Sequence, residues 1–169
     1  VILLFLLPNF SFGSVCSPGT FTDGDDCTPC DPGFFQPYEN SIECFSCPEG
    51  FYQSLQNSLD CILCPSGYSQ IDTGKSNCEE CNEGYFSTSE GNIECSECPK
   101  GYYQENKLAD SCISCPAGFY SMFEAEDYCM ECEPGKFQQN PSQESCQTCS
   151  QGKFADLNKM TVCKVGYVN

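Results

Sequence analysis

The stretch CPKGYYQENKLADSCISC, residues 98–115, decides the fold, because it holds one complete copy of a pattern that fills the chain. A cysteine opens the copy, a glycine follows three residues later, two aromatic residues come next, and Cys112 closes it before Cys115 opens the next copy. The resulting C-x-x-C pairs recur every 17 residues, starting at Cys27, Cys44, Cys61, Cys78, Cys95, Cys112, Cys129 and Cys146. A fixed period indicates stacked supersecondary units. We therefore predict one elongated array of about nine 17-residue repeats.

Glycine and aromatic residues keep the same phase as the cysteines. The glycines are Gly19, Gly33, Gly50, Gly67, Gly84, Gly101, Gly118, Gly135 and Gly152, and Gly166 starts one more pattern. Such a glycine indicates a turn with a positive φ or a close backbone contact. The paired rings predict a ladder that covers the disulfides, with an exposed strip for sugars or apolar ligands as the alternative. The unit opening at Cys64 has Ser69 in place of the second ring, so we expect it to be the weaker one.

The composition predicts a small disulfide-rich fold. The 169 residues include 18 cysteines, no histidine, and 24 acidic side chains against seven lysines, for a net charge of −17. Few aliphatic residues follow residue 13, so cross-links must replace a conventional core. We expect short strands, tight turns and almost no helix. An acidic chain without arginine is a poor partner for nucleic acid, and the lack of histidine argues against an enzyme or a cofactor site.

The ends of the array bear on how the cysteines pair. Cys16 opens a unit and Cys163 closes the last one. If each unit closes on itself, the bonds are Cys16–Cys27, Cys30–Cys44, Cys47–Cys61, Cys64–Cys78, Cys81–Cys95, Cys98–Cys112, Cys115–Cys129, Cys132–Cys146 and Cys149–Cys163. A staggered pattern that ties neighbouring units together stays open on spacing alone. Bonds within each C-x-x-C pair would leave the two end cysteines without regular partners.

The same C-x-x-C pairs have two competing chemistries. Zinc could be held by two such pairs, and a thioredoxin-like pair could exchange disulfides. Both need thiolates, which an oxidising compartment disfavours. Acidic neighbours such as Glu79 and Glu80 also raise a thiol pKa. We therefore rank zinc binding and thiol redox work below a structural role.

The ends of the chain differ from the array. Residues 1–13, VILLFLLPNFSFG, resemble the apolar region and cleavage site of a secretory signal peptide whose basic start is missing. The tandem repeats then cover residues 14–163, and residues 164–169 look like the start of a further, truncated repeat. We expect an extracellular product, either secreted or part of a cell-surface ectodomain. Any membrane attachment would come from sequence downstream of these residues.

The units resemble the ephrin-receptor-like cysteine-rich repeats, which are related to the cysteine-rich modules of tumour-necrosis-factor and growth-factor receptors. The shared motif is C-x-x-G-x-[FY], as in Cys47-Pro48-Glu49-Gly50-Phe51-Tyr52, followed by closure at Cys61 and a new start at Cys64. The resemblance covers residues 16–163. It implies an extracellular location, closure of each loop by the first and second cysteine of its unit, a rod-like shape and an interaction role. With one bond per unit, cytokine binding is not carried over.

Acidic residues precede most of the closing cysteines. They are Asp26, Glu43, Asp60, Glu94, Asp110, Asp127 and Glu144. If the twist between units is small, they form a negative stripe that keeps the array soluble and could collect divalent cations or a basic partner. Asp23, Asp25 and Asp26 form the densest group and are a weak calcium candidate, since the EF-hand spacing is incomplete.

The sequence thus favours a non-enzymatic extracellular rod. It would belong to a receptor ectodomain or a surface-coat protein, act as a spacer and present its loops to an unidentified protein partner. Its stability would add up along the array, unit by unit. A small secreted ligand or inhibitor is the alternative function.

Overall fold

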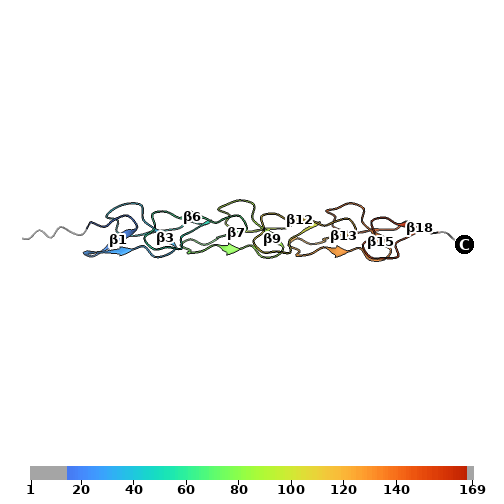
Figure 1. The fold of residues 1–169 in the computed structure, drawn as a ribbon, viewed down its shortest axis with the longest axis horizontal. Coiled ribbons are helices and arrows are strands. Elements are labelled where there is room, and N and C mark those ends of the chain that lie inside the picture. Colours follow the sequence, from blue (N-terminus) through green and yellow to red (C-terminus); the bar gives the residue numbers. More distant parts are fainter. Residues whose placement is uncertain (1–14, 167–169) are drawn as a thin grey trace, which may run out of the picture.

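The structure, a computed structural model, describes residues 15–166, which form a long, narrow array (Figure 1). We number its nine units 1 to 9 from their opening cysteines, which are Cys16, Cys30, Cys47, Cys64, Cys81, Cys98, Cys115, Cys132 and Cys149. Positions within a unit are counted from that cysteine as position 1. The predicted signal peptide, residues 1–13, lies outside the described residues.

Each unit is one small antiparallel hairpin. The strands are β1 (Thr20–Asp23), β2 (Asp26–Pro29), β3 (Phe34–Phe35), β4 (Phe45–Ser46), β5 (Phe51–Tyr52), β6 (Ile62–Leu63), β7 (Tyr68–Ser69), β8 (Glu79–Glu80), β9 (Tyr85–Phe86), β10 (Ser96–Glu97), β11 (Tyr102–Tyr103), β12 (Ile113–Ser114), β13 (Phe119–Tyr120), β14 (Met130–Glu131), β15 (Lys136–Phe137), β16 (Gln147–Thr148), β17 (Lys153–Phe154) and β18 (Lys164–Val165). They pair two by two, each with the next along the chain. The prediction of short strands, tight turns and almost no helix is confirmed, since residues 15–166 contain no helix.

Unit 6 shows how the pattern builds the hairpin. Gly101 has a φ of 81°, a value that favours glycine, and so turns the chain after Cys98. Tyr102 then pairs with Ser114 across β11 and β12. The Cys115 N–H donates to the Gly101 carbonyl at 2.9 Å and closes the hairpin next to the disulfide. The glycine thus forms the turn, the two rings form the first strand and the cysteines close the same hairpin.

Every disulfide joins the two cysteines of a single unit. Eight of the nine bonds span 14 residues, and the first spans 11. Their Cα atoms lie 5.4 to 5.8 Å apart, within the usual disulfide range. No cysteine of residues 15–166 is left as a thiol. All 18 cysteines lie in that range, so the structure leaves no thiolate for zinc binding or disulfide exchange.

Neighbouring units are joined by three backbone hydrogen bonds that recur along the array. Between units 6 and 7, the Gly101 N–H donates to the Ser121 carbonyl at 3.0 Å and the Gln104 N–H donates to the Glu126 carbonyl at 3.1 Å. In the reverse direction, the Ala125 N–H donates to the Cys98 carbonyl at 2.9 Å. These bonds satisfy backbone groups that would otherwise be buried without partners.

Contacts also reach two units along the chain. A β-carbon built on Gly84 of unit 5 would lie 2.1 Å from the carbonyl oxygen of Ala125 in unit 7. The same close approach recurs along the array, and in each case the glycine at position 4 of one unit approaches the carbonyl oxygen at position 11 of the second unit after it. The glycines are Gly19, Gly33, Gly50, Gly67, Gly84, Gly101 and Gly118. Each interior unit is thus packed against four others, and the expectation that stability adds up unit by unit stays a prediction.

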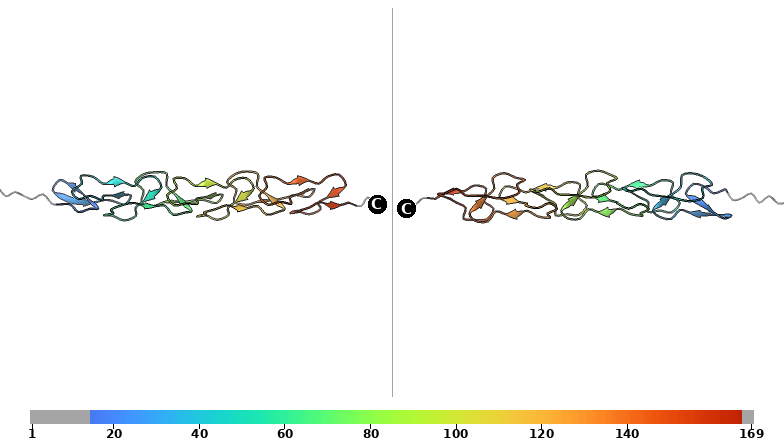
Figure 2. Two further views of the ribbon diagram at one scale, coloured as in Figure 1. Left: turned by 90° about the horizontal axis from the view of Figure 1, so that it is seen from above. Right: turned by 180° about the vertical axis from the view of Figure 1, so that it is seen from behind.

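The array twists strongly from unit to unit. In Figure 1, strands β1, β7 and β13, which belong to units 1, 4 and 7, are seen in similar orientation, and the views in Figure 2 show the same recurrence. Units three apart thus face the same way, whereas adjacent units do not. The seven acidic residues before the closing cysteines are all exposed, but this twist distributes them around the rod. A single negative stripe would require a small twist between units. Because the twist is large, these residues do not form one stripe.

The buried interior differs from the predicted ladder of rings. The opening cysteines of units 1 to 8 are at most 1% exposed, and the next buried column is position 7, with Gln36, Gln53, Gln70, Ser87, Gln104, Ser121, Gln138 and Ala155. The rings are only half-buried or exposed, and Phe34 and Phe154 are 36% and 43% exposed. Phe35 and Phe45 are the one ring pair in contact within residues 15–166. The rings therefore flank the core, because an array one hairpin thick has too little depth to enclose them.

The last residues complete unit 9. Lys164 and Val165 form β18, which pairs with β17, and the Gly166 N–H donates to the Gly152 carbonyl at 2.9 Å. In earlier units an opening cysteine makes this bond. Residues 164–166 thus close the ninth hairpin, and the interpretation of residues 164–169 as the start of a further, truncated repeat stays a prediction. Residues 15–166 contain no helix of the length and hydropathy that a bilayer crossing requires.

Candidate functional site

The surface hollows of the array are copies of one groove. Five of them share the same lining positions, namely position 6 of one unit and positions 2, 5, 14 and 15 of the next. They lie between units 1 and 2, 4 and 5, 6 and 7, 7 and 8, and 8 and 9. The fold thus repeats one potential contact site, and the side chains at these positions distinguish each copy.

The groove between units 4 and 5 is the largest of the five. Its volume is about 550 Å³, whereas the other four measure about 360, 300, 230 and 160 Å³. Position 6 explains the difference, because it is Ser69 here and Phe21, Tyr103, Tyr120 or Phe137 in the others. Replacing a ring by a hydroxymethyl group removes one wall of the groove. The weaker stability expected of this unit stays a prediction.

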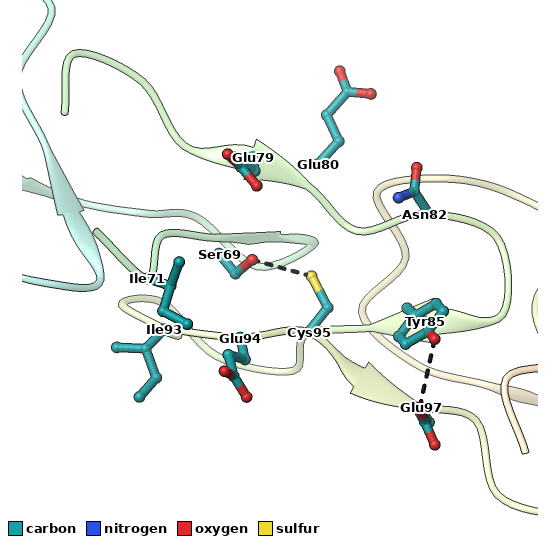
Figure 3. A pocket seen from close by; sticks show the side chains of 10 residues that line it. All are labelled: Ser69, Ile71, Glu79, Glu80, Asn82, Tyr85, Ile93, Glu94, Cys95 and Glu97. Atoms are coloured by element: carbon teal, nitrogen blue, oxygen red, sulfur yellow. Dashed lines mark hydrogen bonds between the residues drawn. The ribbon is translucent and has the colours of Figure 1, made fainter. Parts of the chain in front are cut away.

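Figure 3 shows how the walls of this groove are arranged. Ser69 and Cys95 lie at its centre, and Ser69 Oγ is 3.3 Å from Cys95 Sγ, so its hydroxyl can donate to the disulfide sulfur. Ile71 and Ile93 lie together on one side, and Tyr85 lies on the other. The two isoleucines are 50% and 49% exposed, so they offer apolar surface to an incoming group.

Four glutamates give this groove a strongly negative lining, namely Glu79, Glu80, Glu94 and Glu97. No lysine lines it, and none of the ion pairs within residues 15–166 involves these carboxylates. The Tyr85 hydroxyl lies 3.5 Å from Glu97 and is the one hydrogen-bond partner of these four carboxylates within that range. Four negative charges on one concave surface focus the potential there and attract cations.

The corresponding grooves near the C-terminal end carry lysines. Lys136 lines the groove between units 7 and 8, and its Nζ lies 3.7 Å from Glu133. Lys153 lines the groove between units 8 and 9. The same backbone site thus changes its charge along the array. The groove at Ser69 carries four glutamates, the grooves between units 1 and 2 and between units 6 and 7 carry two and one acidic side chains, and the last two grooves carry a lysine each.

Within residues 15–166, two carboxyl groups have a pKa clearly below its ordinary value, and a lysine is the main cause in both. A hydrogen bond from Lys159 lowers the pKa of Glu131, with a second one from Asn158 in the same direction. Similarly, hydrogen bonds from Lys164 lower the pKa of Asp156. Lys159 of unit 9 reaches Glu131 of unit 7 at 2.8 Å, so this pair adds a charged link between units two apart.

The buried glutamine column positions the walls of the grooves. Gln104 donates its amide to the Ser111 carbonyl at 2.7 Å and accepts a hydrogen bond from the Asn106 N–H at 3.0 Å. The same two bonds, to positions 14 and 9, recur for Gln36, Gln53, Gln70 and Gln138. Each glutamine therefore shapes the loop that ends at position 14 of its own unit, and for Gln36 and Gln138 this position lines one of the five grooves. The sequence does contain a signal for this column, because a glutamine directly follows position 6 in five units, but the cysteine and ring pattern alone does not reveal it.

The predicted calcium candidates lie at the tip of unit 1. Asp23 and Asp26 face each other across the hairpin of β1 and β2, and Asp25 lies in the turn between them. All three are exposed. Within residues 15–166 no three acidic or cysteine side chains are grouped so that they could hold a metal ion. The three aspartates thus remain a solvated turn in this structure.

Comparison with known proteins identifies the repeats. The sequence profile described as tyrosine-protein kinase ephrin type A/B receptor-like matches residues 19–54, 37–81, 67–101 and 84–125, four overlapping stretches that together span more than half of the chain. No curated protein sequence matches the chain. The matched stretches contain the complete hairpins and disulfides of units 2 to 6. The chain therefore belongs to the ephrin-receptor-like family of cysteine-rich repeats.

Proposed function

We propose that this chain is a non-enzymatic spacer and protein-interaction module of a cell-surface receptor or surface-coat protein. The family and the density of disulfides support an extracellular, receptor-type module. The observation that carries the spacer role is the unbroken set of contacts between units, which includes those that reach two units along the chain. A rod with such contacts has no hinge between its units.

Stiffness follows from the way each unit is fixed. The three backbone hydrogen bonds hold one unit to the next, and the glycine contact prevents rotation at that junction because a carbonyl oxygen of a third unit fills the space. The disulfide holds the hairpin on which these groups lie. A spacer needs this property, since a flexible chain of the same length would not keep a fixed distance between its ends.

Small-angle X-ray scattering on the oxidised protein tests this proposal. The expected pattern is that of a straight rod with a thin, constant cross-section. Deleting residues 64–114, which are units 4 to 6, keeps the register and should shorten the rod by about a third without changing its cross-section. Curves typical of a flexible chain or a compact particle would contradict the spacer role.

A further inference from the structure

We propose that the groove at Ser69 binds an arginine side chain carried by an extended basic segment of a protein partner. This inference rests on the proposed interaction role and specifies the chemistry of its partner. The groove is the largest of the five copies because the ring at position 6 is missing. Its volume of about 550 Å³ lies within the range of sites that enclose a small group.

Charge complementarity argues for a basic occupant. Glu79 and Glu94 come from neighbouring units and lie on opposite sides of Ser69 and Cys95 in Figure 3, so a cation placed between them meets a carboxylate on either side. Glu97 adds a third carboxylate beside Tyr85. No lysine of this chain lines the groove, so these carboxylates are open to an external cation.

The remaining walls favour arginine among the basic side chains. The guanidinium group is planar, stacks on aromatic rings and bonds carboxylates through two parallel hydrogen bonds. Tyr85 provides a half-buried ring, and Ile71 and Ile93 offer apolar surface to the aliphatic part of the side chain. The groove is open to solvent along the array, so the chain that carries the arginine can lie extended across units 4 and 5.

The other copies of the groove supply the contrast. The groove between units 7 and 8 has Tyr120 at position 6, a volume of about 160 Å³ and Lys136 in its wall. Tyr120 fills the site, and Lys136 pairs with Glu133 so that the lining has no net negative charge; both features disfavour the same occupant. The same array thus contains the proposed binding site and a second copy of the groove that should not bind, which serves as an internal control.

Because the whole chain is acidic, the test must separate the groove from general charge attraction. Binding of a fluorescent Gly-Arg-Gly-Arg-Gly peptide is measured by anisotropy at physiological ionic strength for the wild type and for Ser69→Tyr. This substitution restores the ring found in other units and leaves the net charge unchanged. We expect it to weaken binding by about tenfold or more, because the side chain fills the groove. The Glu79→Gln/Glu94→Gln double variant should weaken binding to a similar extent.

Two controls complete the experiment. Tyr120→Ser opens the groove that contains Lys136 and should leave peptide binding unchanged. The uncharged peptide Gly-Gln-Gly-Gln-Gly should not bind to any variant. Equal binding by the wild type and Ser69→Tyr would overturn the proposal, as would the absence of binding to both. Neither result changes the rod seen by scattering, so failure of this inference and failure of the spacer role are distinguishable.

Discussion

The α-carbon of Gly84 lies so close to the carbonyl oxygen of Ala125, two units along the chain, that a β-carbon there would be 2.1 Å from that oxygen. The φ of 81° at Gly84 already favours glycine, whereas Leu108, Ala125 and Lys159 at position 11 adopt φ values of 61°, 59° and 62°, which other residues tolerate. Contact between units two apart adds a second reason for glycine at position 4 of units 1 to 7. At Gly152, which has a φ of 79° and nothing within 4 Å of the β-carbon position, only the conformational reason applies.

This difference gives a matched pair of substitutions. Gly84→Ala should destabilise the protein by about 2–5 kcal/mol, because it adds an overpacked backbone contact to the strain of a positive φ. Gly152→Ala introduces only the conformational strain and should cost about 1–2 kcal/mol. Chemical denaturation of the oxidised proteins measures both values. Equal losses for the two variants would contradict the contact as the reason for glycine.

The buried glutamines give a second prediction. Gln104→Ala removes two side-chain hydrogen bonds from a residue that is 6% exposed and leaves the Ser111 carbonyl and the Asn106 N–H without those partners. We expect a loss of about 2–4 kcal/mol by denaturation. The exposed Gln147 in β16 is the control, and Gln147→Ala should change stability by less than about 0.5 kcal/mol. Similar effects at both positions would show that the column does not stabilise the loops.

Unit 9 permits the reverse experiment. It has Ala155 at position 7, where five other units have a glutamine. Ala155→Gln should add the two missing bonds, from the new amide to the Val162 carbonyl and from the Leu157 N–H to the new carbonyl oxygen. The expected gain is about 1 kcal/mol, measured as a higher melting temperature. A lower melting temperature would show that the site cannot hold the longer side chain.

Glu131 and Lys159 link stability to pH. The hydrogen bond from Lys159 holds the pKa of Glu131 below its ordinary value of 4.5, so the pair stabilises the fold above that pH. This stabilisation should be lost as the pH falls through the lowered pKa, because the carboxylate then takes up a proton. Carbon NMR titration of Glu131 should show the lowered pKa in the wild type and a return towards 4.5 in Lys159→Met. An unchanged titration would exclude the charged link between Glu131 and Lys159.

Much of this fold could be predicted from the cysteines alone. Their period gives the number of units, and the phase of Gly101, Tyr102 and Tyr103 gives the turn and the strand of each hairpin. The twist could not be predicted, because it is set by backbone bonds between units that leave no mark in the side-chain pattern. For the same reason, the sequence shows that acidic residues precede most of the closing cysteines, but it does not show on which face of the rod each of them lies.

The core and the grooves were predicted only in part. Sequence reasoning places rings in the interior and polar side chains outside, whereas Gln36 and Gln104 are buried because they satisfy the backbone of a loop too short to satisfy itself. Ser69 was noted as a missing ring, but the groove that it opens depends on Tyr85 and Cys95 of the next unit. Such a site needs the relative placement of two units.

Hydrogen exchange, resolved unit by unit, tests the central claim that units two apart stabilise each other. The comparison is between the wild type and Gly84→Ala, with Gly152→Ala as the control. The account predicts faster exchange in unit 5 and also in the loop of unit 7 that contains Ala125, while units 1 and 2 keep their protection. Faster exchange confined to unit 5 would contradict it.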